Sequence, residues 1–215
     1  MSTGDNYNNE KPKSPTEALS ALMDGNKRFV ESFNKTGGRS VELNSVQVQT
    51  ELSPGVVPFA AVLTCADSRV APEIIFNCGI GDIFVVRVAG NVVDPSNQGV
   101  LGSLDFGALE LGARLIMILG HTGCGAVASA IDSVENKKNF PGSINNVVDN
   151  IVPSVMAVKG EPGDLWNNSI ISNVKSGVEN LHALDPLIAQ MANDGNLIIV
   201  GACYDLQTGK VEILT

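Results

Sequence analysis

The chain has 215 residues, with 14 Lys and Arg against 23 Asp and Glu, which gives a formal net charge of −9. Hydrophobic residues make up 44% and charged residues 17%, a composition that excludes a disordered chain or a charged coiled coil. The acidic balance argues against nucleic acid and anionic membranes as partners, since both attract clusters of Lys and Arg. The longest apolar runs, Ile83–Val86 and Leu115–Leu119, are far shorter than the ~20 residues that span a bilayer.

Cysteine usage and the N-terminal segment bear on the compartment. Four cysteines in a chain of this length do not make a disulfide scaffold. The first residues are polar and lack the apolar stretch of a secretory signal. We therefore expect a cytoplasmic protein whose thiols are free, metal-bound or catalytic. Residues 1–13 are interpreted as a flexible tail and residues 14–215 as a single domain.

A helix is the first predicted element after the tail. Ser14 is placed to cap it, Pro15 suits the first helical position, and Glu17 completes a capping box. Apolar residues at helical spacing continue to about residue 33. Residues 34–55 are polar and contain Gly and Pro, which predicts a short helix between loops.

Four continuous apolar runs predict strands: Val56–Leu63, Ile83–Val88, Leu115–Leu119 and Leu197–Val200. Runs of this kind are typical of strands that are buried on both faces of a parallel sheet. Helical patterns lie between them, including Gly99–Leu111 and a segment that Asp185-Pro186 begins and Gly195 ends. Lys210–Leu214 is a predicted edge strand. The predicted fold class is α/β, with a central, mostly parallel β-sheet flanked by helices.

Two polar segments, Thr64–Arg69 and Gly120–Gly125, directly follow the first and third predicted strands. Open α/β sheets bind ligands at the carboxyl ends of their strands, so we expect both segments at one edge. Cys65, His121 and Cys124 then form a set of two thiolates and one imidazole, which suits Zn²⁺ and leaves a fourth position open. The glycines at 120, 123 and 125 are expected to let the backbone turn tightly enough for this.

These residues also have other interpretations. A buried free cysteine usually acts as a small hydrophobic residue, and His-x-x-Cys alone is a weak metal signal. A nucleophilic Cys–His pair would leave the second cysteine unexplained. A thiol redox protein would be expected to carry Cys-x-x-Cys. A non-catalytic zinc scaffold would not need Asp67 and Arg69, which could otherwise form an ordinary ion pair.

Three motifs carry a family resemblance: Cys-Ala-Asp-Ser-Arg (65–69), Gly-Asp-Ile-Phe-Val-Val-Arg-Val-Ala-Gly-Asn (81–91) and Gly-His-Thr-Gly-Cys-Gly (120–125). In this order and spacing the chain resembles the β-class carbonic anhydrases, from about Thr16 to Thr215. The resemblance implies a carbonate dehydratase, a zinc lyase that reversibly hydrates CO₂ to bicarbonate and a proton by attack of zinc-bound hydroxide. It also implies an N-terminal helical arm that wraps a partner subunit, and a dimeric building block that assembles as a dimer or higher homo-oligomer.

The same resemblance implies roles for individual residues. Cys65, His121 and Cys124 match the ligands of one Zn²⁺ per subunit. Asp67 and Arg69 match a catalytic dyad in which Asp67 orients the nucleophile and Arg69 keeps Asp67 off the metal. The residues that match the CO₂ pocket, some of them from the neighbouring subunit, are Phe84, Val88, Phe106, Gly123 and Gly125. The three apolar side chains among them are equally candidates for the core.

The chain departs from the family pattern at two places. Val56 stands where many members have a Gln that orients substrate oxygen, so hydrolysis of carbonyl sulfide or carbon disulfide on the same zinc scaffold is the alternative function. Arg87 and Tyr204 match two residues of a bicarbonate regulatory site that also needs an upstream Trp. The single Trp of this chain is Trp166, far downstream, and we therefore do not expect that regulatory site.

Overall fold

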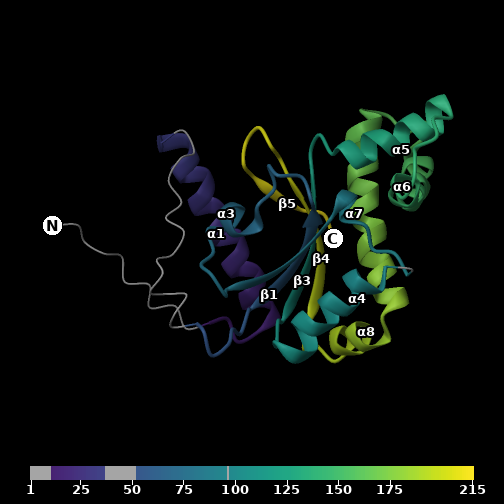
Figure 1. The fold of residues 1–215 in the computed structure, drawn as a ribbon. Helices are drawn as coiled ribbons and strands as arrows, with labels where there is room; N and C mark the ends of the chain where they lie inside the picture. The colour runs from purple at the N-terminus through teal and green to yellow at the C-terminus, as the bar shows by residue number, and fades with distance from the viewer. Residues whose placement is uncertain (1–10, 37–51, 96) are drawn as a thin grey trace.

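The computed structural model describes residues 11–36, 52–95 and 97–215. Helices cover both faces of a central sheet (Figure 1). One face is covered by α1 (Pro15–Thr36) and the short α3 (Pro72–Ile75). The other is covered by α4 (Gln98–Asp105), α7 (Leu165–Leu184) and α8 (Pro186–Asn193). Two further helices, α5 (Gly125–Asn136) and α6 (Ile144–Val158), pack against each other and against α7.

The sheet has five strands among the described residues, in the order β2-β1-β3-β4-β5. Their bounds are β1 Ala60–Cys65, β2 Ile83–Val88, β3 Leu115–His121, β4 Ile198–Tyr204 and β5 Val211–Ile213. The first four are parallel, and β5 pairs antiparallel with β4 at the edge. The predicted α/β class with a mostly parallel central sheet is therefore confirmed.

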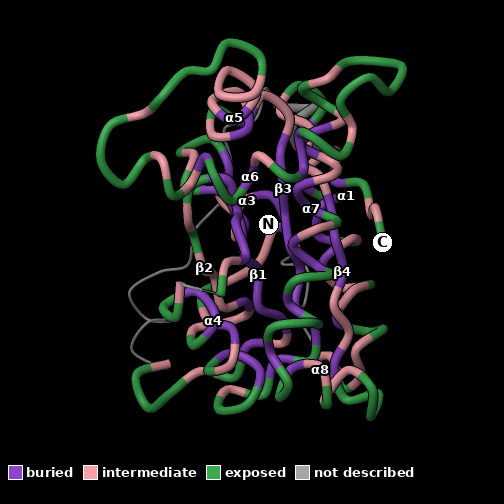
Figure 2. Tube along the Cα trace, turned by 90° about the vertical axis from the view of Figure 1, so that its right-hand side faces the viewer, coloured by how far each residue is buried: buried purple, intermediate pink, exposed green. Residues whose placement is uncertain are grey.

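Successive residues of the inner strands point to opposite helical layers. Val62 of β1 and Met117 of β3 join Leu22 of α1 in one apolar cluster. Leu63 of β1 joins Val174 of α7 in the cluster on the other face. Every residue of β1 and β3 is buried, and Figure 2 shows these strands in the centre of the molecule. Burial on both faces is the reason for continuous rather than alternating apolar runs.

Several predicted boundaries are wrong by a few residues. The first strand begins at Ala60 rather than Val56, because Pro58 has no N–H to donate and the inter-strand bonding begins at Phe59. Strands β1, β3 and β4 each end later in the sequence than predicted. Cys65 and His121 are consequently the last residues of their strands. Backbone pairing continues past the apolar run because it does not depend on the side chain.

The predicted helices are also present with altered bounds. The helix at Gly99–Leu111 is α4 followed by a π-helical turn, η2 (Phe106–Glu110). The helix capped by Asp185 is α8, and the Asp185 carboxylate accepts hydrogen bonds from Leu187 and Ile188 at 3.1 Å each. Residues 1–10 of the predicted tail (1–13) lie outside the described residues. So do residues 37–51, which make up most of the segment 34–55 in which a short helix was predicted, while residues 34–36 belong to α1.

Helix α1 begins as its sequence predicts. The Ser14 hydroxyl accepts a hydrogen bond from the Glu17 N–H at 3.2 Å, and the Glu17 carboxylate accepts one from the Lys13 N–H at 2.7 Å. The helix then packs on the sheet of its own protomer. Its buried Asn26 accepts a hydrogen bond from Val211 at 3.0 Å and donates one to Gly209 at 2.9 Å, which ties α1 to the C-terminal hairpin.

Among residues 11–36, 52–95 and 97–215, no helix has both the length and the apolar character needed to cross a bilayer.

Candidate metal centre

The structure brings Cys65, His121 and Cys124 together. Cys65 ends β1, His121 ends the neighbouring strand β3, and Cys124 caps the N-terminus of α5. Their ligand atoms all lie within 4.8 Å of one another, and all three residues are buried. No other cluster of this kind is found in the described part of the chain. Adjacent parallel strands end side by side, and for this reason two motifs 56 residues apart share one site.

The donor set fits a zinc ion. His121 Nδ1 lies 2.9 Å from the Thr122 carbonyl oxygen, which can only accept, so Nδ1 donates this hydrogen bond and Nε2 is the ring nitrogen available to a metal. Nε2 is buried and has no hydrogen-bond partner among the described residues. The two sulfur atoms are 4.0 Å apart. Tetrahedral Zn²⁺ with Zn–S bonds of ~2.3 Å separates two thiolates by roughly 3.8 Å, close to this spacing.

The surroundings of Cys65 and Cys124 shift the pKa values of both thiols. The pKa of Cys65 is lowered to about 4, chiefly by the hydrogen bond from Cys124, with burial opposing and His121 helping. The hydrogen bond to Cys65 and burial raise the pKa of Cys124. Two thiolates this close repel each other, and a divalent cation bound by both would remove that repulsion.

Backbone amides also face the sulfurs. The N–H of Gly90, in the short 3₁₀ helix η1 (Ala89–Asn91) after β2, lies 3.4 Å from the Cys65 sulfur. The first amides of α5, from Ala126 and Val127, lower the pKa of Cys124 against the larger effects of Cys65 and burial. Amides at a helix N-terminus stabilise a thiolate. Both sulfurs thus receive donors that favour their metal-binding form.

Three glycines were expected to let the backbone between the ligands turn tightly, and the structure shows different roles for them. Gly123 has φ +69°, a left-handed conformation that the turn between His121 and Cys124 requires. Gly120 lies inside β3 rather than in the turn. A Cβ there would lie 2.5 Å from Cγ2 of Val174, so this glycine permits the close approach of α7 to the sheet. Gly125 is the first residue of α5.

Asp67 and Arg69 form a compact ion pair beside the ligands. Asp67 Oδ1 accepts hydrogen bonds from the Arg69 N–H and Nε, both at 2.9 Å, and Oδ2 accepts one from Nη2 at 2.7 Å. These hydrogen bonds, with Arg69's charge, hold the pKa of Asp67 well below its usual range, although burial opposes them. Arg69 Nη2 also lies 3.5 Å from the Gly123 carbonyl, in the turn that carries Cys124. The pair therefore connects the two ligand segments.

Two side chains that sequence reasoning did not place at the site hold its backbone. Arg87 of β2 donates from Nη2 to the Asp67 carbonyl at 2.6 Å and from Nε to the Cys65 carbonyl at 3.3 Å. Trp166 donates from its indole N–H to the Cys124 carbonyl at 3.0 Å. The resemblance had linked Arg87 to a regulatory site rather than to the backbone of the ligand segment, and the sequence contains no signal for the contact of Trp166.

The predicted substrate residues fall into two groups. Val88 pairs with Cys65 in the sheet, and Gly123 and Gly125 flank Cys124. Phe84 and Phe106 instead pack on each other, with ring centroids 6.3 Å apart, and Phe84 pairs with Ala61. Ala61 precedes Cys65 by four residues, or about 13 Å along a strand. The aromatic pair thus lies away from the metal ligands of its own protomer.

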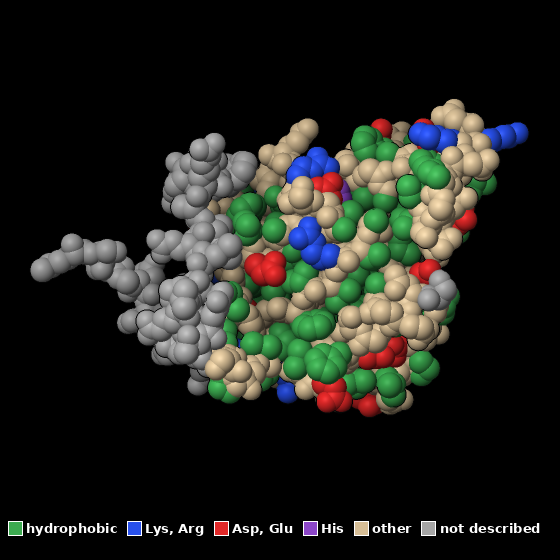
Figure 3. Space-filling view, viewed as in Figure 1, with side chains coloured by type: hydrophobic (Ala, Val, Ile, Leu, Met, Phe, Trp, Pro, Cys, Tyr) green, Lys and Arg blue, Asp and Glu red, His purple; other side chains and the backbone are tan. Residues whose placement is uncertain are grey.

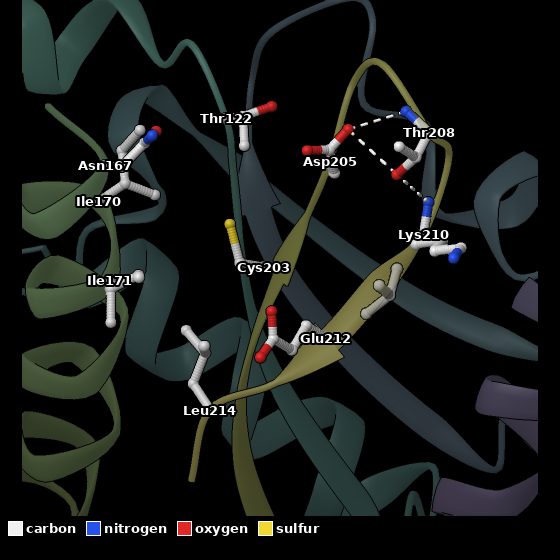
Figure 4. Close-up of a pocket in the computed structure, with 11 residues that line it drawn as sticks. Thr122, Asn167, Ile170, Ile171, Cys203, Asp205, Thr208, Lys210, Glu212 and Leu214 are labelled. Carbon is white, nitrogen blue, oxygen red and sulfur yellow. Dashed lines mark hydrogen bonds between the residues drawn. The ribbon is translucent and has the colours of Figure 1, made fainter. Parts of the chain in front are cut away.

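A cavity of about 530 Å³ lies between α7, β4 and β5 (Figure 4). Figure 4 shows Cys203, Ile171 and Leu214 directed into it. Thr122, from the turn between His121 and Cys124, lies at its upper end. Burial, with Asp205 and Glu212 nearby, raises the pKa of Cys203 to about 11, so this thiol is neutral. The predicted substrate residues do not line this cavity. Val88 lines a separate one of about 270 Å³ with Val92 and Val147.

The chain is similar to known proteins over nearly its whole length. A family model described as carbonic anhydrase matches residues 60–211. "Carbonic anhydrase 2" of Mycobacterium tuberculosis is 36% identical over 199 residues, covering 93% of this chain and 92% of that protein. The β-carbonic anhydrase of Coccomyxa, solved with acetazolamide, is 26% identical with a TM-score of 0.70, covering 91% and 86%. A tetrameric β-carbonic anhydrase of Sordaria macrospora is 19% identical with a TM-score of 0.71, covering 91% and 95%.

Proposed function

This chain belongs to the β-class of the carbonic anhydrase family, and from that premise we propose that it catalyses the reversible hydration of CO₂ to bicarbonate and a proton. The observation that carries the proposal is the buried Cys65–His121–Cys124 set with the Asp67–Arg69 pair beside it. Zinc bound there supplies a nucleophile near neutral pH, because it lowers the pKa of its bound water from ~15.7 towards ~7. The remaining steps depend on side chains of this chain.

Asp67 orients the attacking water. Among the described residues, Oδ1 accepts two hydrogen bonds, one for each of its lone pairs, whereas Oδ2 accepts one. The second lone pair of Oδ2 is therefore the acceptor available for a proton of the water, and Asp67 would orient the water through this bond. Arg69 keeps the carboxylate ionised and, through its fork, holds it in this orientation.

CO₂ is small and apolar, so its pocket must exclude water rather than supply charge. Val88, beside Cys65, is suited to one wall of such a pocket, and the backbone of Gly123 and Gly125 to another. Phe84 and Phe106 are too far along the sheet to serve the metal of their own protomer. We assign them to the pocket of a neighbouring subunit in a dimer or higher homo-oligomer. Phe106 is 50% exposed in the protomer, which supports this assignment.

We place the activity in the cytoplasm. All four cysteines are described, and all are free rather than paired in disulfides. Two of them must be reduced thiolates to hold zinc, and a reducing compartment keeps them so.

The decisive experiment is a stopped-flow CO₂ hydration assay on protein of measured zinc content. We expect one zinc per subunit, rapid hydration, and loss of activity after chelation that zinc restores. Asp67→Asn should bind zinc normally and lose at least ~100-fold in kcat/KM, within the range for a group that handles the reacting proton. Faster sulfide release from carbonyl sulfide than hydration of CO₂, or full activity in Asp67→Asn, would overturn the proposal.

A further inference from the structure

Trp166 is the single tryptophan of the chain and the second residue of α7. Its indole N–H donates to the carbonyl of Cys124, 42 residues earlier in the sequence, at 3.0 Å. The residue is 38% exposed, so it is not primarily a core residue. The indole N–H is therefore bonded to the backbone of a residue that the proposed function assigns to zinc.

The Cys124 side chain is buried in an apolar cluster, whereas the residues on both sides of it carry no side chain. It stands between two glycines, and a Cβ on Gly125 would meet no atom within 4 Å. A Cβ on Gly123 would meet only a Leu206 methyl group, at 3.9 Å. The side-chain positions of both glycines therefore face little close packing. The Cys124 carbonyl oxygen is held by two hydrogen bonds, one from the Ala128 N–H of α5 at 3.1 Å and one from Trp166.

Helix α7 is itself firmly placed. The Asp164 side chain caps its N-terminus by accepting a hydrogen bond from Asn167 at 2.8 Å. Two turns further on, Val174 packs against Gly120, the residue before His121 in β3. The same helix thus contacts the strand that carries His121 and the carbonyl of Cys124. Through these contacts it sets the position of two ligands relative to each other.

We propose that Trp166 is a positioning residue for the metal centre: its N–H fixes the peptide plane at Cys124, and so directs the sulfur towards Cys65 and His121. The inference rests on the zinc site of the proposed function. Outer partners of metal ligands commonly change metal affinity by about 10- to 100-fold when removed. A single neutral hydrogen bond to a ligand's carbonyl belongs at the lower end of that range.

The test compares two substitutions. Trp166→Phe keeps an aromatic ring but removes the N–H donor, and Trp166→His restores a ring N–H. Zinc transfer to a chromogenic chelator should be about 10-fold faster in Trp166→Phe than in wild type, and slower again in Trp166→His. The absorption bands of the cobalt-substituted site, which report ligand geometry, should shift in Trp166→Phe and return towards the wild-type spectrum in Trp166→His. Leu184→Ala, at the far end of α7, is the matched control and should match wild type.

Tryptophan emission provides a test that needs no variant. Trp166 is the only source of this signal, so its spectrum should change when zinc is removed from wild type and return when zinc is added back. Identical spectra with and without zinc would overturn the inference. It would also fail if Trp166→Phe released zinc at the wild-type rate, or if both substitutions accelerated release equally, which would indicate packing. A wild-type protein that takes up no zinc would overturn the metal site itself.

Discussion

At the scale of single residues, the site depends on how one carboxylate is held. Arg69 contacts both oxygens of Asp67 and supplies the charge that keeps it ionised. Its planar fork matches a carboxylate in a way that the single ammonium of Lys does not. Substitutions of Arg69 can therefore distinguish the effect of its charge from the effect of its two-point contact with Asp67.

We expect Arg69→Gln to lower kcat/KM for CO₂ hydration by about 10- to 100-fold, because it removes both the charge and the fork. Arg69→Lys keeps the charge and should lose less. Stopped-flow assays at fixed zinc content measure both values. Arg114→Gln, an exposed arginine at the opposite end of β3, is the control. Equal activity in all four proteins would show that the pair has no catalytic role.

A second carboxyl pair lies away from the metal. Burial, followed by a hydrogen bond and charge repulsion from Asp185, raises the pKa of Asp105 to about 6. Asp105 Oδ1 is buried without a hydrogen-bond partner among the described residues. Asp185 is committed as an acceptor, since its Oδ1 caps α8. The protonated form of Asp105 is therefore the one that the fold favours.

This raised pKa predicts a pH dependence of stability. Unfolded Asp ionises near pH ~3.9, so between there and about pH 6 the folded state binds more protons than the unfolded state. The contribution of Asp105 to the free energy of unfolding consequently falls as pH rises through this window. Asp105→Asn can still donate to Asp185 and should be more stable than wild type near neutral pH. That advantage should shrink towards pH ~4.

Urea unfolding of metal-free protein at several pH values measures the difference. Asp149→Asn, an exposed residue of α6, controls for the general loss of a negative charge. A constant difference between Asp105→Asn and wild type across the window would contradict the assigned pKa shift.

At the scale of elements, α7 is the helix on which the site depends. It packs against β3 and β4, and the Asp164 side chain caps its N-terminus. Trp166 in its first turn donates a hydrogen bond to the carbonyl of Cys124. Its close approach to the sheet requires Gly120, where a Cβ would lie 2.5 Å from Val174. The sequence presents this glycine as part of a turn, and the structure shows it as a packing contact.

We expect Gly120→Ala to destabilise the fold by about 1–3 kcal/mol, the usual cost of overpacking a core. Val174→Ala removes the methyl group that clashes, so the double variant should lose less stability than the sum of the single variants. Denaturant unfolding of the three proteins gives the coupling. Gly102→Ala in α4, where a Cβ meets nothing within 4 Å, should not be destabilising. Strict additivity at 120 and 174 would refute the contact.

At the scale of the whole molecule, the protomer has an uncovered apolar region. Strand β2 ends the sheet, and beside it Phe106 and Leu109 are 50% and 43% exposed. Figure 3 shows hydrophobic side chains over the middle and lower part of the face that Figure 1 presents. A second copy that covers this region would bury these side chains and bring the Phe84–Phe106 pair towards another metal centre.

We expect Phe106→Asp to shift the protein towards the 22.5 kDa protomer in sedimentation velocity, because it places a charge in an apolar contact. CO₂ hydration should fall with the loss of assembly. Leu187→Asp is the matched control, since it places the same charge on another exposed apolar side chain, 56% exposed on α8. Unchanged mass and activity in Phe106→Asp would contradict both the interface and the shared pocket.

The sequence by itself determined those features that depend on near neighbours in the chain. Continuous apolar runs indicated strands buried on both faces, and Ser14 and Asp185 marked helix starts. Two short motifs at strand ends predicted that Cys65, His121 and Cys124 lie together in a set that could hold a metal. These predictions succeeded because hydrogen bonding, capping and strand-end placement are local. The strand bounds were less accurate, since Pro58 and the pairing partners decide where a ladder begins and ends.

The tertiary structure alone decided the contacts that surround the ligands. Trp166 lies 42 residues from Cys124, and Arg87 lies 20 residues from Asp67. Each reaches the site only because a helix or an edge strand packs at one particular angle and register. Helical periodicity shows which face of a helix is buried, but not which loop its first turn will contact. That depends on the shapes of all the side chains between helix and sheet, Gly120 and Val174 among them.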